Sequence, residues 1–276
     1  MIDQRPIYAV ADVHGRADLL EAIIAHAEDD AARRGREPRI VFLGDIVDRG
    51  PESRRALDLV IGTLCRHPGS VQILGNHDMW FLCGASLEEP FPDETSWLRH
   101  GGVETLLSYS DEPWPSYVTR SRIDALRQFV REHHADHVEA LRNASLFHDE
   151  GRMLFVHAGI RPGVSEQEPM DFFWIRQEFL EHVGPLPRVV VHGHTIIGDT
   201  PIVTENRISL DTGAYASGRL SLLVVDPVER SLSFRQTDGG PGRVVEIEPK
   251  LLDRGLGTVL DDVPALFEPI PTPMPA

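Results

Sequence analysis

Five short polar motifs, each lying directly after a short apolar run, constrain the fold of this 276-residue chain more than any other feature. A short apolar run is typical of a buried β-strand, and a polar motif directly after it presents charge where the strand ends. One such motif would mean little, but five motifs that each follow an apolar run in this way indicate a shared polar centre. In chain order they are Ala11-Asp12-Val13-His14-Gly15, Gly44-Asp45-Ile46-Val47-Asp48-Arg49-Gly50, Gly75-Asn76-His77-Asp78, Val156-His157-Ala158-Gly159 and His192-Gly193-His194-Thr195.

The first part of the chain alternates strands with amphipathic helices. Apolar residues at helical spacing predict helices over residues 18–32 and 53–64, and apolar runs predict strands over 7–10, 39–43 and 71–74. Such alternation is typical of a parallel sheet covered by helices, with ligands at the carboxyl ends of the strands. Because the first three motifs follow these strands, we expect them to meet at one edge of the sheet.

Residues 79–150 differ in texture, since four prolines interrupt the pattern and a helical stretch is predicted over residues 121–144. We interpret this segment as a mainly helical insertion, or cap. His133 and His137 stand four residues apart, a spacing at which two side chains share one helix face and could bind a metal. Their charged neighbours favour a solvated face instead, and we prefer that interpretation.

The strand pattern resumes after residue 152. Strands are predicted over residues 153–156, 188–191, 207–210 and 220–225, then two closing antiparallel strands over 231–235 and 243–247, and a helix over 171–180. We therefore expect an α/β protein with one domain over residues 1–250, of which 79–150 form the insertion. Residues 251–276 end in closely spaced prolines and are interpreted as a proline-rich C-terminal tail.

Composition restricts the partners. With 27 basic and 43 acidic residues the net charge is −16, which disfavours binding to nucleic acid or to an anionic membrane. An anionic substrate would therefore need a local positive site. The sequence shows neither a secretory signal pattern nor a run long enough to span a membrane, so we expect a cytoplasmic protein. Cys65 and Cys83 are expected to be free thiols, and the oligomeric state stays open.

Six residues of the five motifs are potential metal ligands. Carboxylate, carboxamide and imidazole groups without thiolates suit Mn, Fe or Zn, and a carboxylate can bridge two ions. We predict a site for two divalent metal ions, with Mn²⁺ as the first expectation. The six residues are Asp12, His14, Asp45, Asn76, His157 and His194.

The order of the motifs resembles the phosphoprotein phosphatase family of calcineurin-like metallophosphoesterases, most closely its bacterial and lambda-phage branch. The series Asp-x-His-Gly, Gly-Asp-x-x-Asp-Arg-Gly, Gly-Asn-His-Asp, His-Ala-Gly and Gly-His-Thr runs in family order over residues 12–195, and Asp211-Thr212-Gly213-Ala214 adds to the likeness. The resemblance implies a layered α/β fold, in which a β-sheet sandwich is flanked by helices and carries a mainly helical cap.

The resemblance also implies how the ligands divide between two metal ions. His192 is a rival to His194, but the family's Gly-His pair matches Gly193-His194. The first metal ion would be held by Asp12, His14 and Asp45, and the second by Asp45, Asn76, His157 and His194, so that Asp45 bridges them.

Further residues are expected to bind and protonate the substrate. Arg49 and Arg176 resemble the family's phosphate-binding arginines, and Asn76 is a third expected phosphate contact. The implied mechanism is direct in-line attack on phosphorus by a metal-bridging hydroxide, with no phosphoenzyme.

The leaving oxygen needs a proton, and His77 is the candidate donor because its ordinary pKa near 6.5 suits the task. The resemblance implies Asp48 as the partner that orients His77. Asp78 is a rival partner, although a residue next to His77 on the same turn usually points elsewhere.

These features predict a metal-dependent phosphatase of phosphate monoesters, with phosphorylated Ser, Thr or Tyr in proteins as the first expectation. The alternative is a hydrolase of dinucleoside polyphosphates of the diadenosine tetraphosphate type, or of another small phosphate ester, because such hydrolases resemble the family in the same motifs. A third hypothesis is a scaffold without catalysis. A deep enclosed pocket with stacking aromatic residues would favour nucleotides, and an open groove would favour phosphoproteins. The candidate stacking residues are Trp80, Trp97, Trp114 and Trp174.

Overall fold

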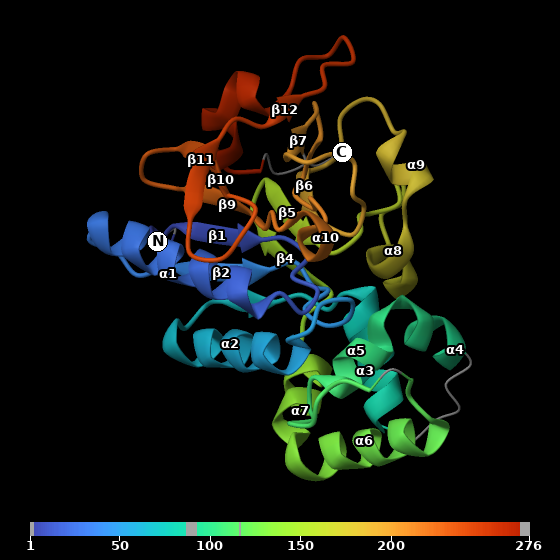
Figure 1. Ribbon diagram of the computed structural model, residues 1–276. Helices are drawn as coiled ribbons and strands as arrows, with labels where there is room; N and C mark the ends of the chain where they lie inside the picture. Colours follow the sequence, from blue (N-terminus) through green and yellow to red (C-terminus); the bar gives the residue numbers. More distant parts are fainter. Residues whose placement is uncertain (1–2, 87–92, 116, 271–276) are drawn as a thin grey trace.

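The computed structural model describes residues 3–86, 93–115 and 117–270, which form two mixed β-sheets with helices outside them (Figure 1). Each sheet has six strands. One large hydrophobic core contains residues from both sheets, for example Tyr8 and Phe42 from the first and Phe155 and Ile208 from the second. This arrangement confirms the expected layered α/β fold with flanking helices.

The first sheet has the strand order β11-β10-β9-β1-β2-β3. Its strands are β1 (Ile7–Val10), β2 (Arg39–Phe42), β3 (Val71–Gln72), β9 (Ser221–Asp226), β10 (Ser231–Thr237) and β11 (Val244–Ile247). β1, β2 and β3 pair in parallel, as the alternation of strands and helices predicts. β1 also pairs with β9 in the antiparallel sense, with Ile7 opposite Val225, so the closing strands extend the sheet on its other side.

The second sheet has the strand order β12-β7-β8-β6-β5-β4. Its strands are β4 (Phe147–Glu150), β5 (Met153–Val156), β6 (Val189–His192), β7 (Ile202–Val203), β8 (Arg207–Ser209) and β12 (Lys250–Leu251). β5, β6 and β8 run parallel. β4 is an edge strand antiparallel to β5, although it falls within the segment interpreted as a helical insertion. β7 and β12, with two residues each, lack any pattern that predicts them.

Two amphipathic helices cover the first sheet. α1 (Ala17–Arg33) packs near β10 and β11, and α2 (Ser53–Arg66) packs against β2 and β3. In α1 the apolar residues recur at helical spacing and are buried, as Leu19, Leu20 and Ile23 show. Burying each such side chain contributes roughly 1.5–3 kcal/mol, so this face fixes the helix on the sheet.

The cap consists of short helices that gather on one side of the molecule, below the sheets in Figure 1. Within it, Phe81 stacks on Tyr109 with ring centroids 5.9 Å apart, and Trp97 is completely buried beside them. Its helices are α3 (Asn76–Ser86), α4 (Glu94–Trp97), η1 (Leu98–Gly102), α5 (Val103–Leu107), α6 (Arg120–His133) and α7 (Ala135–Arg142).

Two expected helices are broken in the structure. The stretch predicted over residues 121–144 is two helices, α6 and α7, which meet at the non-helical His134. The helix predicted over 171–180 is also two, α8 (Pro169–Trp174) and α9 (Gln177–Leu180), separated by the extended Ile175 and by Arg176. Ile175 is buried in a second hydrophobic cluster with residues of β5 and β6. Tertiary packing of Ile175 therefore accompanies the interruption of a pattern that alone predicts one helix.

The described chain after β11 includes one short strand, β12, and one 3₁₀ helix. η2 (Val259–Phe267) is a 3₁₀ helix that buries Val259 and Leu266, and a capping box between Thr258 and Asp261 fixes its start. Because β12 and η2 lie at and beyond residue 250, the division into a domain over 1–250 and a tail from 251 stays a proposal. Residues 271–276 of the predicted tail lie outside the described residues.

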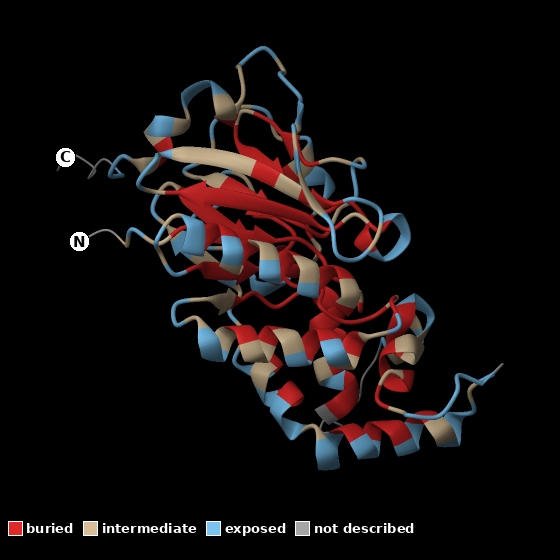
Figure 2. Cartoon of the chain, turned by 60° about the vertical axis from the view of Figure 1, so that its left-hand side comes forward, coloured by how far each residue is buried: buried red, intermediate tan, exposed pale blue. Residues whose placement is uncertain are grey.

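Burial follows the layers of the fold. Figure 2 shows buried residues concentrated in the sheets and on the helix faces that pack against them, with exposed residues on the outer faces. None of the helices in the described ranges combines the length and apolar character that a membrane crossing requires. Polar side chains are mostly exposed in folded proteins, so the buried polar residues stand out, and several of them belong to the five motifs.

The junction of β2 and β3 generates a stability prediction. Gly44 has φ +96°, and a Cβ on it would lie 2.6 Å from the backbone nitrogen of Gly75. Gly151 has φ +65°, but a Cβ there would meet nothing within 4 Å. We expect Gly44→Ala to lower the free energy of unfolding by roughly 2–5 kcal/mol, from backbone strain plus overpacking, and Gly151→Ala by only about 1–2 kcal/mol from strain.

Urea unfolding of the wild type and both variants measures the two losses. Equal losses would contradict the close approach of the Gly44 and Gly75 segments, since the matched variant shares the positive φ and lacks the crowding.

Candidate functional site

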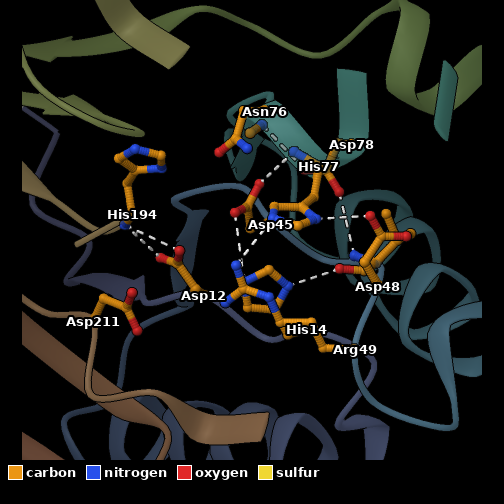
Figure 3. Close-up of polar contacts among 12 residues, drawn as sticks. Asp12, His14, Asp45, Asp48, Arg49, Asn76, His77, Asp78, His194 and Asp211 are labelled. Carbon is orange, nitrogen blue, oxygen red and sulfur yellow. Dashed lines mark hydrogen bonds and ion pairs between the residues drawn. The ribbon is translucent and has the colours of Figure 1, made fainter. Parts of the chain in front are cut away.

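The five polar motifs meet where strands of the two sheets end, and Figure 3 labels residues from four of them. Asp12 follows β1, Asp45 follows β2, and His157 and His194 follow β5 and β6. Direct contacts join the motifs, because the backbone N–H of His194 donates to both carboxylate oxygens of Asp12 at 3.0 and 3.1 Å. At the start of α3, Asn76 has its Oδ1 3.0 Å from Nε2 of His157. The strand ends therefore bring residues separated by up to 182 positions into contact.

The backbone at this edge adopts conformations that are rare outside glycine. Positive φ angles of this kind cost roughly 1–2 kcal/mol per residue and concentrate at functional sites. Arg230 is the one further non-glycine residue with positive φ in the described part of the chain. The motif residues with φ between 46° and 72° are His14, Asp45, Asp48, Arg49 and His194.

Two histidine rings are fixed so that the same nitrogen of each faces Asp45. Nδ1 of His14 lies 2.9 Å from the carbonyl oxygen of Val47, and Nδ1 of His157 lies 2.9 Å from that of Leu43. When Nδ1–H donates to a carbonyl, Nε2 keeps its lone pair and can bind a metal. The two Nε2 atoms each lie 3.5 Å from one oxygen of Asp45. Asp45 therefore stands between two imidazoles, as a shared ligand of two ions would.

Two groups of potential metal ligands share Asp45. Within each group the ligand atoms lie within 4.8 Å of one another. Asp12 belongs to neither group, although its carboxylate is held beside them by His194. The first group therefore contains two of the three residues predicted for the first ion, and the second contains three of the four predicted for the second. The groups are His14, Asp45 and His77, and Asp45, His157 and His194.

The electrostatics of the cluster fit two divalent cations. Burial raises the pKa of Asp12 well above its ordinary value, and the charges of Asp211 and Asp45 raise it further. Burial also raises the pKa of Asp45 to about 6 and that of Asp211 to about 6. Crowded buried carboxylates are unfavourable until positive charge is placed among them. Burial lowers the pKa of His157 to about 4, which keeps its imidazole neutral, the form that binds metals.

The rival histidines His192 and His194 have different surroundings. Nδ1 of His192 lies 3.0 Å from the carbonyl oxygen of Gly193 and its Nε2 lies 2.7 Å from Oγ of Ser209, so both ring nitrogens are engaged away from the cluster. The ring of His194 lies against His157, with centroids 5.0 Å apart. Of the two, His194 has its ring at the cluster.

Arg176 lies in the non-helical break between α8 and α9, and from there its side chain reaches the cluster. Its backbone is non-helical, with φ −134° and ψ −84°, and its Nε–H donates to Nε2 of His194 at 2.9 Å. The structure thus brings both predicted phosphate-binding arginines to the site. Arg49 contacts Nε2 of His77 through Nη2 at 3.1 Å.

His77 contacts Asp48 and not Asp78. Nδ1 of His77 lies 2.7 Å from Oδ2 of Asp48. Asp78 instead accepts hydrogen bonds from the backbone nitrogens of Ile46 at 2.9 Å and Gly75 at 3.1 Å, so its carboxylate braces the loop after β2. Burial raises the pKa of Asp48 to about 8 and lowers that of His77 to about 4, so both shifts favour the uncharged forms.

Sequence reasoning missed several residues of the site. Tyr215 packs its ring 4.7 Å from the guanidinium carbon of Arg49, directly after the stretch Asp211-Thr212-Gly213-Ala214 that carried part of the family resemblance. That proximity is the signal that could have found it. Trp97 and Thr105 of the cap bind Asp48 from 49 and 57 residues away, and no local pattern marks them.

His137 of the cap belongs to a hydrogen-bonded network with Tyr109 and Asp58. His134, Asp136 and His137 also lie close enough to share a metal. Nδ1 of His137 lies 2.8 Å from the hydroxyl oxygen of Tyr109, and its Nε2 lies 3.0 Å from Oδ1 of Asp58. Both ring nitrogens of His137 are therefore engaged, which favours a structural interpretation of this group. His133 is not part of it.

A groove of about 1100 Å³ opens beside the cluster, between the cap and the segment of α8 and α9. Trp80 of α3 and Trp174 of α8 form part of its wall, with ring centroids 5.1 Å apart, and Arg49 and Arg176 lie at its inner end. Trp97, in contrast, is buried within the cap. Two of the four tryptophans considered as stacking residues therefore line the groove.

Comparison with known proteins gives the family. Residues 5–216 match the model of the calcineurin-like phosphoesterase family. The chain is 26% identical over 237 residues to the asymmetrical bis(5'-nucleosyl)-tetraphosphatase PrpE of Anoxybacillus flavithermus, covering 78% of this chain and 88% of that protein. It is 25% identical over 247 residues to a symmetrical bis(5'-nucleosyl)-tetraphosphatase of Methylococcus capsulatus, covering 86% and 71% respectively.

Solved structures agree in fold. A crystal structure provisionally described as that of a diadenosine tetraphosphatase superimposes with a TM-score of 0.53 at 20% identity, over 91% of this chain and 96% of that one. The cold-active protein-tyrosine phosphatase of a psychrophilic Shewanella species superimposes with a TM-score of 0.54 at 17% identity, over 90% and 81%. At these identities the likeness supports the fold alone.

The match over most of the length shows that this chain belongs to the calcineurin-like phosphoesterase family. It is a metallophosphoesterase, and the two ligand groups that share Asp45 provide candidate positions for the divalent metals of the family. The specific expectation of a protein phosphatase is not confirmed, since the two curated relatives above are named for dinucleoside tetraphosphates.

The crowded carboxylates lead to a prediction about metal and pH. The raised pKa values of Asp45 and Asp211 mean that these two carboxyl groups contribute less to the stability of the metal-free folded protein as pH rises from about 3.8 to about 6. Mn²⁺ pairs with the ionised carboxylates, so it should stabilise more at pH 7.5 than at pH 5. At one hundred times its Kd, we expect the Tm of chelator-treated protein to rise by about 5–10 °C at pH 7.5.

Thermal unfolding followed by circular dichroism, with and without Mn²⁺ at both pH values, measures this shift. Asp45→Asn serves as the control and should reduce the metal-dependent shift. An equal shift at both pH values would contradict the assignment of these carboxylates to the metal positions.

Proposed function

We propose that this protein hydrolyses dinucleoside polyphosphates of the diadenosine tetraphosphate type. The observation that carries the proposal is the groove, which combines an aromatic wall of Trp80 and Trp174 with Arg49 and Arg176 beside the ligand cluster. A nucleobase stacks on aromatic rings, and a phosphate chain binds guanidinium groups. The curated relatives named for this substrate class support the same proposal.

The two arginines are suited to bind phosphate because, among the described residues, neither forms a direct ion pair with a carboxylate. Arg49 contacts His77 and Tyr215, and Arg176 contacts His194. By contrast, Arg161 in the same groove is paired with Asp171. In a protein of net charge −16, guanidinium groups that lack a direct ion pair are where an anionic chain can bind.

The predicted ligand set supplies the rest of the chemistry. Two divalent ions on these side chains would act as Lewis acids that polarise the phosphate and make water nucleophilic at neutral pH. Mn²⁺ remains our first expectation for both, on the grounds of carboxylate, carboxamide and imidazole donors. The residues proposed to hold them are Asp12, His14, Asp45, Asn76, His157 and His194.

The chain's own residues would bind the phosphate and move a proton. Arg49 and Asn76 would hold the oxygens of the reacting phosphate. Arg176, which lies between α8 and α9, would hold them as well. His77 would donate the proton from Nε2 while Asp48 holds Nδ1. A bound phosphate raises the pKa of His77 from its low value, because negative charge near the ring favours the imidazolium form.

Phosphoprotein phosphatase activity is the second candidate. The groove is open along one side and is not an enclosed cavity, the feature that we expect for a phosphopeptide substrate. The two substrate classes differ in their leaving groups. Cleavage of a dinucleotide releases a nucleotide whose leaving oxygen belongs to a phosphate group, with a second pKa of about 6. The serine alkoxide released from a phosphopeptide is far more basic, so it depends much more on a proton donor.

A substrate panel tests the proposal. With Mn²⁺ we expect kcat/KM for diadenosine tetraphosphate to exceed that for a phosphoserine peptide at least about tenfold. Chromatography of the products then distinguishes two molecules of ADP, the symmetrical cleavage, from ATP plus AMP, the asymmetrical one. A preference for the phosphopeptide would reject the dinucleotide proposal and support the second candidate.

Trp174→Ala tests whether the aromatic wall of the groove contributes to nucleotide binding. Loss of one base-stacking contact of about 1–3 kcal/mol should raise KM for the dinucleotide by roughly 5–150-fold. p-Nitrophenyl phosphate, which has no base, should be affected far less. Equal effects on both substrates would remove Trp174 from nucleotide binding.

The proton-donor role of His77 gives a separate prediction. His77→Asn should lower kcat by roughly 10²–10⁴ on a phosphoserine peptide or another alkyl phosphate, and much less on p-nitrophenyl phosphate or the dinucleotide. Steady-state kinetics on the three substrates, with bound metal checked by elemental analysis, measures the pattern. Undiminished turnover of the alkyl phosphate would exclude His77 as the acid.

A further inference from the structure

The carboxylate of Asp48 is held by the cap. Its Oδ1 accepts hydrogen bonds from the hydroxyl of Thr105 at 2.6 Å and from Nε1–H of Trp97 at 3.1 Å. Its Oδ2 lies 2.7 Å from Nδ1 of His77. Asp48 and Trp97 are fully buried, so these bonds are shielded from bulk solvent. The two oxygens are thus divided, one held by cap residues and the other by the proposed proton donor.

Thr105 is hydrogen-bonded to both the side chain and the backbone of Asp48. Besides donating to the carboxylate, its Oγ1 accepts the backbone N–H of Asp48 at 2.8 Å and lies 3.1 Å from Oγ of Ser53. One hydroxyl has one proton and two lone pairs, so these three contacts use its full capacity. The hydroxyl therefore fixes the position of the Asp48 side chain relative to its strained backbone, whose φ is +72°.

The cap is also closely packed around the same point. Cβ atoms on Gly84 and Gly102 would each lie 2.5 Å from a ring atom of Trp97, so only glycine leaves room for the indole. A Cβ on Gly101 would lie 2.2 Å from the backbone nitrogen of Arg49. The guanidinium of Arg127 covers Trp97, with its central carbon 5.4 Å from the ring centroid. The indole is thereby confined in the orientation that points its N–H at Asp48.

We propose that Thr105 and Trp97 are positioning residues of the reaction, which orient Asp48 so that Oδ2 aligns His77 for proton transfer. Without them Oδ1 would be a buried acceptor that lacks partners, and the carboxylate would rotate toward another donor such as Arg49. His77 would then lose the contact that sets its ring orientation. This inference rests on the proton-donor role proposed above for His77, and it adds the cap to the catalytic machinery.

Thr105→Val and Thr105→Ser form a matched pair for the test. Valine keeps the shape and removes the hydroxyl, whereas serine keeps the hydroxyl. With Mn²⁺ present, we expect Thr105→Val to lower kcat on phenyl phosphate about tenfold more than on p-nitrophenyl phosphate, because the poorer leaving group depends on the proton donor. KM should change little on either substrate, and Thr105→Ser should restore most of the lost kcat.

A double-mutant cycle separates this effect from a general loss of structure. In a His77→Asn background Thr105→Val should produce no further substrate-dependent loss, because both changes interrupt the same chain of contacts. Equal losses on both substrates, or additive losses in the double variant, would overturn the inference and leave Thr105 with a structural role. If His77→Asn alone shows no dependence on the leaving group, the proposed donor role itself fails.

Trp97→Phe keeps the inference testable if Thr105→Val does not fold, as judged by circular dichroism and Tm. This variant keeps an aromatic ring and removes the N–H donor. We expect the same dependence of kcat on the leaving group, with a smaller magnitude, because Thr105 still holds Oδ1. Loss of kcat that is uniform across substrates would again reject the positioning role.

Discussion

Repulsion among buried carboxylates is the constraint on which the rest of this structure depends. Asp12, Asp45 and Asp211 are brought together where the strands of two sheets end, and burial raises the pKa of each. A fold that buries such groups side by side gains stability at neutral pH when positive charge is added among them. The neutral imidazoles of His14 and His157 are oriented toward the same space by backbone carbonyls. Metal binding and folding are therefore expected to be linked in this protein.

The same edge is where the backbone is most constrained. Residues with positive φ angles cluster in the motifs, and Gly193 approaches Asp12 so closely that a Cβ would lie 1.9 Å from its Oδ1. The strain is balanced by the sheets and their shared core, which hold the strand ends in fixed relative positions. Rigid strands with strained ends are a way to place ligands accurately, since each side chain leaves a fixed backbone at a fixed angle.

Much of the fold and of the ligand cluster could be predicted from the sequence, because both depend on local patterns. β1, β2 and β3 follow from apolar runs that alternate with amphipathic helices, and the ligands follow from their place after each run. Other features depend on contacts across the fold. Arg176 lies in a helix break where packing of Ile175 competes with helical periodicity, and β4 is an edge strand that no buried pattern marks. The contacts of Trp97 and Thr105 with Asp48 span 49 and 57 residues, so a reading of neighbouring residues cannot reveal them.

The cap contributes both to the groove and to the contacts of Asp48. Its helix α3 supplies Trp80 to the wall of the groove, while Trp97 and Thr105 hold the carboxylate that contacts His77. Phe81, which follows Trp80 on α3, packs against Trp97 with ring centroids 6.4 Å apart, so the groove wall and the support of Asp48 belong to one packed unit. A nucleotide leaving group needs little protonation, so loss of the support of Asp48 would slow its release less than that of an alkoxide. If Trp97 and Thr105 position Asp48 as proposed, the cap contributes to proton transfer as well as to the shape of the groove.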